Sequence, residues 1–287
     1  MFRNALFYVK ILAAFLPFIA AEIRRAFLAI RFRIQGKISG MSAPGDRTRN
    51  IVILGASFSG HHAARLLVSC LPPRSNYRVV VIEPNSHFQF TWVLPRFCVA
   101  KGHEHKAFIP YGGYATGPEG ALTWIKGRAE TISKETVTVD NGEEISYDFV
   151  LIATGASVSG LPSRVNRTEK ADGMKRLQEM QHRIEVAKTV VVVGGGAAGV
   201  EVATDAKSLY PDKSIILVHP RKAVMHRFGT GLQEKAKEGL DKVGVELILE
   251  DRVIEETQET IKLKSGKTIS CDYVVSIKCS IFVRHIH

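Results

Sequence analysis

One stretch constrains the fold of this chain more than any other: residues 190–203, where four valines run directly into closely spaced glycines. Four consecutive β-branched apolar residues are typical of a parallel strand that is buried on both faces. The small and apolar residues after the last glycine predict a helix. A strand, a glycine-rich turn and a helix in this order indicate an α/β fold with a parallel sheet.

The spacing of Gly194, Gly196 and Gly199 has a physical reason. The first glycine permits a tight turn, the second lets the backbone approach a pyrophosphate, and the third lets the helix pack closely on the strand. The N–H groups at the start of the helix favour the phosphates of such a ligand. We therefore predict a dinucleotide-binding unit in which these residues contact the ligand: Gly194, Gly195, Gly196, Ala197, Ala198 and Gly199.

The second strand of this unit, residues 214–218, ends at His219, where an acid would bind the ribose of NAD. No acid is present there, and Arg221 and Lys222 follow instead. A cationic loop at this point suits a 2′-phosphate, so NADP(H) and NAD(H) both stay open as ligands. His219 and Arg221 are the predicted contacts at this end of the unit.

A second glycine-rich turn follows another apolar strand, residues 51–54, and has serine in the middle place of the glycine pattern. The next strand, 77–82, ends at Glu83, and an acid there accepts hydrogen bonds from an adenosine ribose. A third strand, 148–153, is predicted to be buried and ends in small residues, which let a ligand lie against the backbone. The predicted contacts are Gly55, Ala56, Ser57, Phe58, Ser59, Gly60, Glu83, Ala153, Thr154 and Gly155.

Weaker patterns place the other elements. Asn-Gly at 141–142 and Ser-Gly at 265–266 indicate hairpin turns. The aromatic and apolar run 88–95 suits either the lining of a site for a flat ring or ordinary core. An exposed amphipathic helix that joins the two units is expected over 169–188. The remaining predicted elements are a helix over 232–243 and strands over 245–249 and 272–277.

Residues 1–40 differ in composition from the rest of the chain. An apolar run over 5–21 is interrupted by Lys10 and Pro17, basic residues follow it, and Glu22 is the only acid among the first 45 residues. Three interpretations stay open: a membrane-anchor helix, a mitochondrial transit segment, and an interfacial helix that lies on a membrane. Membrane association is common to them, at a mitochondrial membrane or on the cytoplasmic face of another. A helix packed on the protein's own surface is the alternative, and Pro17 argues against one uninterrupted helix.

The net charge of +11 is unevenly distributed along the chain. Residues 1–50 hold 9 Lys and Arg against 2 Asp and Glu, or +7, and the remainder holds 30 against 26, or +4. A nucleic-acid-binding domain would carry a basic stripe on the folded part itself. The charge therefore argues against nucleic acid as a partner.

Cysteine and histidine patterns give no evidence for a metal site. None of the four cysteines forms a CxxC motif, and their spacing fits neither a zinc site nor a redox-active dithiol. Cys70 and Cys98 lie among apolar residues, so we expect both thiols to be buried. Residues 103–105, His-Glu-His, lie between two lysines and are predicted to form a solvated loop.

Two dinucleotide folds in one chain, the second inserted after an Ala-Thr-Gly, resemble the plan of the two-dinucleotide-binding-domain flavoproteins, the pyridine nucleotide-disulfide oxidoreductase-like proteins. Within them the chain is most similar to the apoptosis-inducing-factor-like NAD(P)H oxidoreductases. The resemblance covers residues 50–277. It is carried by residues 55–60, Glu83, the Leu-Pro-Arg-Phe run at 94–97, residues 153–155 and residues 194–201.

The resemblance implies FAD on the first unit, with Arg96 as a contact beyond the loop 55–60 and Glu83. It implies NAD(P)H on the second unit, with Glu201 near the nicotinamide. A hydride would pass from the nicotinamide to the flavin, and electrons would pass on to a quinone or another acceptor. The cofactors carry this chemistry, so no catalytic acid or base is required from a side chain. The absence of CxxC argues against the disulfide reductase branch.

The expected fold is therefore α/β, with two Rossmann-like units, the second inserted in the first, after an N-terminal hydrophobic and basic helical segment. The family's chain returns after its NAD(P) domain to complete the FAD domain, and no recognisable return segment follows residue 277. The expected domains are an anchor or targeting segment (1–40), a linker (41–49), the first part of an FAD-binding domain (50–160), a connecting helix (161–188), an NAD(P)-binding domain (189–277) and a short tail (278–287).

Two functions are weighed on these grounds. The first is an FAD-dependent NAD(P)H oxidoreductase. The alternative is a C-terminally truncated, catalytically impaired nucleotide-binding or membrane-tethered interaction protein of the same family, which binds FAD weakly or not at all. A flavin monooxygenase shares both glycine motifs, but no further signature of that class lies between them.

Overall fold

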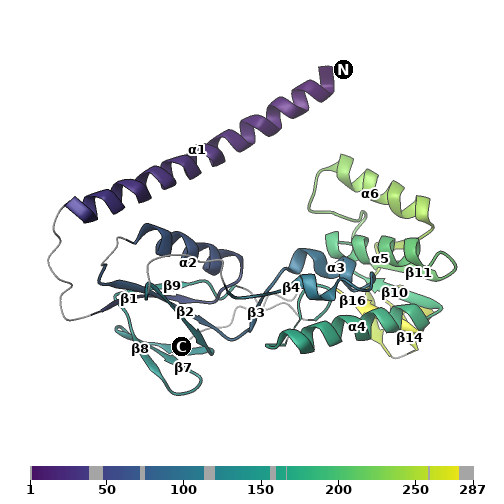
Figure 1. Ribbon diagram of the computed structural model, residues 1–287. Helices are drawn as coiled ribbons and strands as arrows, with labels where there is room; N and C mark the ends of the chain where they lie inside the picture. Colours follow the sequence, from purple (N-terminus) through teal and green to yellow (C-terminus); the bar gives the residue numbers. More distant parts are fainter. Residues whose placement is uncertain are drawn as a thin grey trace. The chain divides into compact units, whose positions relative to one another are not determined.

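A computed structural model describes residues 2–38, 48–71, 75–112, 120–155, 160–165, 167–257 and 259–277 (Figure 1). The contacts within the chain divide it into two units. Unit 1 contains Met1–Pro84 and Gly112–Gly155, and unit 2 contains Asn85–Tyr111 and Ala156–His285. Residues 85–111 thus group with unit 2, whereas the domain expected from the sequence for the first dinucleotide fold runs from 50 to 160. The expected linker at 41–49, except for its last two residues, and the tail at 278–287 lie outside the described residues.

Unit 1 is built on a parallel four-stranded sheet with the strand order β5-β2-β1-β9. One face of this sheet packs against a three-stranded antiparallel sheet, and the shared core contains Val52, Ile82 and Val137. The elements of this unit are α1 (Phe2–Ile38), β1 (Arg49–Leu54), α2 (Phe58–Cys70), β2 (Tyr77–Glu83), β5 (Leu122–Lys126), β6 (Ala129–Ile132), β7 (Thr136–Val139), β8 (Glu144–Ser146) and β9 (Phe149–Ile152).

Unit 2 repeats this plan with a parallel sheet in the order β12-β11-β10-β16 and a second antiparallel sheet, β13-β14-β15. Its main elements are α4 (Lys170–Val186), β10 (Thr189–Val193), α5 (Ala197–Leu209), β11 (Ser214–His219), α6 (Thr230–Val243), β12 (Glu246–Leu249), β13 (Val253–Glu256), β14 (Thr260–Leu263), β15 (Thr268–Ser270) and β16 (Tyr273–Ser276). The predicted parallel strands and the helices expected over 169–188 and 232–243 are confirmed, each within three residues of its expected bounds. Both predicted hairpins and the helix after the second glycine-rich turn are also present.

The valines of β10 explain why unit 2 has cores on both faces of its sheet. Val191 packs with Ile261 of the antiparallel sheet, while Val190 and Val192 face the opposite side. There the helices α4, α5 and α6 cover the sheet, and Leu177 of α4 is completely buried. Burial of whole aliphatic side chains such as these contributes about 1.5–3 kcal/mol each.

Residues 85–111 join unit 2 through the core between its parallel sheet and the helices α4, α5 and α6. They form β3 (His87–Gln89), the 3₁₀ turn η1 (Thr91–Val93), α3 (Leu94–Phe97), the turn η2 (Glu104–Ala107) and β4 (Phe108–Pro110). The ring of Phe108 is fully buried against α4, where a Cβ on Gly173 would lie 2.9 Å from it. The aromatic run at 88–95 is not uniform core, because Leu94 is buried and Trp92 is 72% exposed.

Helix α1 continues through Pro17, so the expected interruption there does not occur. A proline removes one backbone hydrogen bond of the helix, and at an exposed position water can satisfy the carbonyl that loses its partner. In the part of the chain that the structure describes, no helix combines the length and apolarity needed to cross a bilayer.

Two expectations about burial are wrong. The sequence predicts β9 to be buried, but among the described strands it is an edge strand that pairs only with β1, and Phe149, Leu151 and Ile152 are exposed. Cys98 and Cys271 are buried as free thiols, whereas Cys70, at the last turn of α2, is exposed. The thiol of Cys98 has a strongly raised pKa, because burial disfavours the thiolate.

Candidate functional site

The first loop, residues 55–60, connects β1 to α2 as the sequence predicts. Gly55 has a φ of +90°, and a Cβ on it would lie 2.7 Å from the carbonyl O of Ala153. A Cβ on Gly60 would lie 1.8 Å from the carbonyl O of Gly55, so α2 starts directly against the turn. Both glycines are therefore required by the geometry of the backbone. Ser57 begins α2 without a hydrogen bond from its side chain to the helix, and Ser57, Phe58 and Ser59 are exposed.

Glu83 closes this loop from the end of β2. The backbone N–H of Ala56 donates a hydrogen bond of 2.6 Å to Oε2 of Glu83, whose side chain is buried. The sequence predicts Glu83 as a ribose acceptor, and the structure adds a second task, because the carboxylate also holds the loop amide. Hydrogen bonds to a charged acceptor are about twice as strong as neutral ones.

Residues 153–155 lie beside the first loop, as the predicted site requires. The N–H of Ala153 bonds to the carbonyl O of Leu54 at 2.9 Å, and its Cβ faces the Gly60 position. Thr154 and Gly155 are exposed at the carboxyl end of β9. The structure thus brings the sequence-predicted residues of unit 1 together at the carboxyl ends of its parallel strands, and Arg96 belongs to unit 2.

The second loop, residues 194–199, has the same geometry in unit 2. Gly194 has a φ of +120°, a Cβ on it would lie 3.0 Å from the carbonyl O of Ile277, and a Cβ on Gly199 would lie 1.8 Å from the carbonyl O of Gly194. Gly196 differs from these two glycines, because nothing lies within 4 Å of its Cβ position. The space at Gly196, next to the first turn of α5, is therefore open, and we call it the cradle because a pyrophosphate could approach the backbone there. Ala197 is exposed and Ala198 half-buried beside it.

His219 takes the place in unit 2 that Glu83 has in unit 1. It ends β11, its side chain is 5% exposed, and its Nδ1 accepts a hydrogen bond of 3.0 Å from the N–H of Gly195. Its Nε2 lies 3.2 Å from Nδ1 of His226. Burial lowers the pKa of His219, and the nearby His226 and Arg221 lower it further. The imidazole is therefore neutral at pH 7 and serves as an acceptor.

The loop after β11 is a part of the site that the sequence analysis missed. The N–H of Met225 donates a hydrogen bond of 2.7 Å to the carbonyl O of Gly195, and Met225 adopts a φ of +54°, which is unusual for a residue with a side chain. Val224 is buried against Gly195. No local pattern in the sequence indicates this contact. Arg221, a predicted ligand contact, and Lys222, which follows it in the sequence, are both exposed on the same loop.

Arg96 lies in unit 2, on α3, although the resemblance assigns it to the FAD unit. Its guanidinium forms an ion pair of 2.7 Å with Asp205 of α5. Burial raises the pKa of Asp205, and Arg96 acts in the opposite direction. Glu201 lies one turn earlier on α5, and burial followed by repulsion from Asp205 raises its pKa. The structure therefore pairs Arg96 with Asp205 of α5, one helical turn after Glu201.

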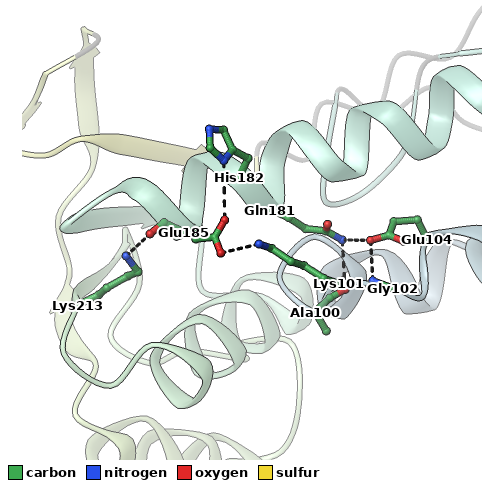
Figure 2. Close-up of polar contacts among 8 residues, drawn as sticks. All are labelled: Ala100, Lys101, Gly102, Glu104, Gln181, His182, Glu185 and Lys213. Atoms are coloured by element: carbon green, nitrogen blue, oxygen red, sulfur yellow. Dashed lines mark hydrogen bonds and ion pairs between the residues drawn. The ribbon is translucent and has the colours of Figure 1, made fainter.

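A polar network on α4 holds the segment that carries Arg96 (Figure 2). The amide of Gln181 donates to the carbonyl O atoms of Phe97 and Ala100 and, at 2.7 Å, to Oε1 of Glu104. Glu104 is buried, so the expectation of a solvated loop is wrong at this residue, although His103 and His105 are exposed. Burial alone would raise the pKa of Glu104, but the hydrogen bonds that its carboxylate accepts outweigh this and lower it.

The same network ties α4 to the sheet of unit 2 through Glu185 (Figure 2). Its carboxylate pairs with Lys101 at 2.5 Å and lies 3.8 Å from Nδ1 of His182. Its carbonyl O accepts a hydrogen bond of 2.6 Å from Lys213, which precedes β11. Among the described residues, no group of three metal-ligating side chains is found in this network or elsewhere.

Comparisons with known proteins agree with this geometry. The chain is 32% identical over 260 residues to "Fe-regulated protein 8" of Mycosarcoma maydis, a match that covers 81% of this chain and 64% of that protein. It is 26% identical to "Apoptosis-inducing factor homolog A" of Dictyostelium discoideum (79% and 59% covered) and 27% identical to "FAD-dependent oxidoreductase FVFD30" of Flammulina velutipes (60% and 55% covered). The chain thus spans between half and two thirds of the length of these relatives.

Solved structures share the fold. The sulfide:quinone oxidoreductase of Aquifex aeolicus superposes with a TM-score of 0.64 at 17% identity, over 83% of this chain and 60% of that one. The model of the pyridine nucleotide-disulphide oxidoreductases matches residues 49–277, which include both units' sheets and both glycine-rich loops. The resemblance stated from the sequence is confirmed: the chain belongs to the pyridine nucleotide-disulphide oxidoreductase family.

Proposed function

We propose that this protein is an FAD-dependent NAD(P)H oxidoreductase. The observation that carries the proposal is the repetition of one binding geometry in two units. In each unit the N–H of the first glycine bonds to the second strand, at 2.8 Å for Gly55 and 2.9 Å for Gly194. In each, a group at the end of that strand accepts a hydrogen bond from the next loop amide. Two such loops suit two dinucleotides, as a hydride transfer between cofactors requires.

The residues divide between the two cofactors as follows. FAD would lie on the first loop and residues 153–155, with Glu83 at its ribose. NAD(P)H would lie on the second loop, with Gly196 at its pyrophosphate and His219 and Arg221 toward its adenosine end. The bound flavin would supply the hydride acceptor, and the protein's own task is to hold the two cofactors in place and exclude water. The name of the relative from Flammulina velutipes, an FAD-dependent oxidoreductase, supports this assignment.

We further propose that α1 binds a membrane as an interfacial helix, at a mitochondrial membrane. Eight of its exposed large apolar side chains follow one another at intervals of three or four residues: Tyr8, Leu12, Phe15, Ile19, Ile23, Phe27, Ile30 and Ile34. These intervals place them on one side of the helix. Val9, Ile11, Leu16 and Phe18 are exposed as well and widen this apolar side. The surplus of basic residues in the same segment favours anionic lipids. A quinone, which dissolves in the bilayer, is the acceptor that this location favours.

The absorbance spectrum of the purified full chain tests the enzyme proposal. We expect flavin bands that bleach when NADPH or NADH is added without oxygen and that return when a soluble quinone is added. A colourless protein that takes up no added FAD would overturn the proposal and favour the impaired binding protein instead. Bands that bleach but do not return with the quinone would support hydride transfer to the flavin and would contradict a quinone as the acceptor.

Flotation with vesicles tests the membrane proposal separately. The full chain should float with vesicles that contain anionic lipid and should be released by replacement of Phe15 and Ile19 with aspartate. Ala14→Asp is the matched control, because Ala14 is also exposed but lies outside the row formed by these eight side chains. Equal release by both changes would contradict an interfacial helix with one apolar side.

A further inference from the structure

His219 and the second loop form a chain of hydrogen bonds that allows only one arrangement of protons. A backbone N–H is always a donor, so the Nδ1 of His219 that accepts from Gly195 must carry no proton. The neutral ring then carries its proton on Nε2, which lies 3.2 Å from Nδ1 of His226. His226 must accept there, so its Nδ1 also carries no proton. Both imidazoles are therefore neutral in this arrangement.

A proton on Nδ1 of His219 would face the N–H of Gly195 and break this contact. The loss of this hydrogen bond would affect the loop, because both the N–H and the carbonyl O of Gly195 form hydrogen bonds to residues outside it. Its N–H bonds to His219, and its carbonyl O accepts from Met225 on the loop after β11. A Cβ on Gly195 would lie 2.9 Å from Cγ of His219, so the imidazole packs directly on the loop. The next residue along the chain is Gly196, where the cradle for a pyrophosphate lies.

The surroundings of His219 oppose its protonation. Burial lowers its pKa most, and His226 and Arg221, both on the loop after β11, lower it further. The neighbouring strand β10 offers only Thr189 and valines, and the first turn of α5 offers alanine, glycine and valine. On β12, Leu249 lies opposite His219 in register, and the Glu250 that follows bonds through its backbone N–H to the carbonyl O of Arg221. None of these elements places a carboxylate against the ring in the contacts described.

We propose that His219 is the positioning residue of the second loop and acts only as the neutral imidazole, so that uptake of one proton by His219 releases the loop and expels the dinucleotide. This inference rests on the proposed function, because it assumes that the second loop binds NAD(P)H. It goes further in assigning the loop a proton-linked regulation that the first loop, closed by a carboxylate, does not share.

Calorimetric titration of the full chain with NAD⁺, in the presence of saturating FAD, tests the inference. NAD⁺ is the probe because it is stable in acid and has no phosphate monoester, whose own pKa lies near 6. Once the pH falls below the pKa of His219, affinity should fall about tenfold per pH unit, and binding should release up to one proton. Proton release is read from the difference in heat between two buffers with different ionisation enthalpies.

Variants separate the role of His219 from that of other groups. His219→Asn keeps an acceptor near the position of Nδ1 but cannot be protonated, so it should bind NAD⁺ at pH 7.5 and release no proton at lower pH. His219→Ala, which keeps no acceptor, should bind weakly at every pH. His182→Asn is the matched control, because His182 is 71% exposed on α4, and it should follow the wild-type profile.

The outcomes distinguish the two proposals. Wild-type protein that binds neither NAD⁺ nor NADPH at pH 7.5 would overturn the proposed function and this inference with it. Binding with the wild-type pH profile retained in His219→Asn would overturn only the inference. If His219→Asn fails to fold, ¹⁵N spectra of histidine-labelled wild-type protein decide: a ring whose Nδ1 is unprotonated in the NAD⁺ complex and takes up a proton as acid releases NAD⁺ supports the inference, and the absence of such a ring overturns it.

Discussion

The two glycine-rich loops of this protein share a backbone geometry and differ in the side chain that closes them. In both, the amide after the first glycine donates to a group at the end of the second strand. In the first loop that group is the carboxylate of Glu83, and in the second it is the imidazole of His219. The loop therefore needs an acceptor at this point, but it does not need a negative charge.

Under the proposed function, this difference suits different ligands in the two loops. A carboxylate at the ribose binds the 2′-hydroxyl and repels a 2′-phosphate, whereas a neutral imidazole followed by Arg221 and Lys222 does not repel it. The same position holds the loop amide and, under the proposed function, also selects the dinucleotide; mutation can separate the two roles.

The largest effect is expected from the glycines at which the two helices approach their loops. In both Gly60→Ala and Gly199→Ala, the new Cβ would lie 1.8 Å from a backbone carbonyl O. Backbone atoms cannot yield as a flexible side chain can, so each change should cost about 3 kcal/mol or more in the free energy of unfolding. Denaturant unfolding measures the loss, and hydrogen exchange shows whether it stays within the altered unit.

Gly196→Ser is the matched control for these two changes, because nothing lies within 4 Å of the Cβ position of Gly196. It also gives the second loop the residue that Ser57 supplies in the first. Stability should change by less than about 0.5 kcal/mol. NADPH should bind less tightly, because the side chain enters the cradle, and unchanged affinity would show that the pyrophosphate lies elsewhere.

Much of this comparison could be predicted from the sequence, because its elements are local. Valine runs before glycines at fixed spacing indicate both loops, and Glu83 and His219 follow at the ends of the next strands. The contacts that were missed join distant parts of the chain: Phe108 packs on α4, and Met225 bonds to the second loop. Neither has a local pattern, since the contact depends on how the chain folds back on itself.

Residues 85–111 also show why domain bounds were harder to predict than loops. They follow β2 of unit 1 in the sequence, but their core side chains pack with α4 and α5 of unit 2. The buried pair of Gln181 and Glu104 strengthens that attachment through a hydrogen bond between residues 77 positions apart. The spacing of apolar residues indicates which of them are buried. It does not indicate which unit they pack against.

Acid should destabilise unit 2, and His87 makes this testable. Burial lowers its pKa to about 4, and its Nε2 has no hydrogen-bond partner among the described residues. The unfolded chain, with a pKa of about 6.5, binds the proton first, so stability falls as the pH drops from about 6.5 toward 4. The loss is at most about 3 kcal/mol for a shift of this size.

Unfolding by denaturant at a series of pH values, followed by hydrogen exchange in each unit, measures this loss. His87→Phe should remove much of the acid sensitivity, because a phenyl ring keeps the edge contact with Phe108 and carries no titratable group. His105→Phe, at an exposed position, is the control and should leave the profile unchanged. If His87→Phe retains the full loss, another buried group is responsible.

A smaller effect, on selectivity and not on folding, is expected from His219→Glu, which gives the second loop the closing group of the first. The carboxylate can still accept from Gly195 but would repel a 2′-phosphate. The ratio of NADPH to NADH affinity should fall about tenfold or more. His219→Gln, which offers an acceptor without charge, is the control. An equal fall in both variants would mean that the lost imidazole, and not the new charge, sets selectivity.

The smallest effect is expected at Arg96, which tests to which loop this residue belongs. Its ion pair with Asp205 has a largely exposed guanidinium, so Arg96→Met should cost less than about 1 kcal/mol of stability. Loss of the arginine also removes the group that opposes the raised pKa of Asp205, so that pKa should rise further. If Arg96 acts with α5, the change should alter NAD(P)H affinity and leave flavin retention unaltered. Loss of flavin with unchanged NAD(P)H affinity would instead support Arg96 as a flavin contact, as the family resemblance implies. Its ion pair with Asp205 would then be secondary to its role at the flavin.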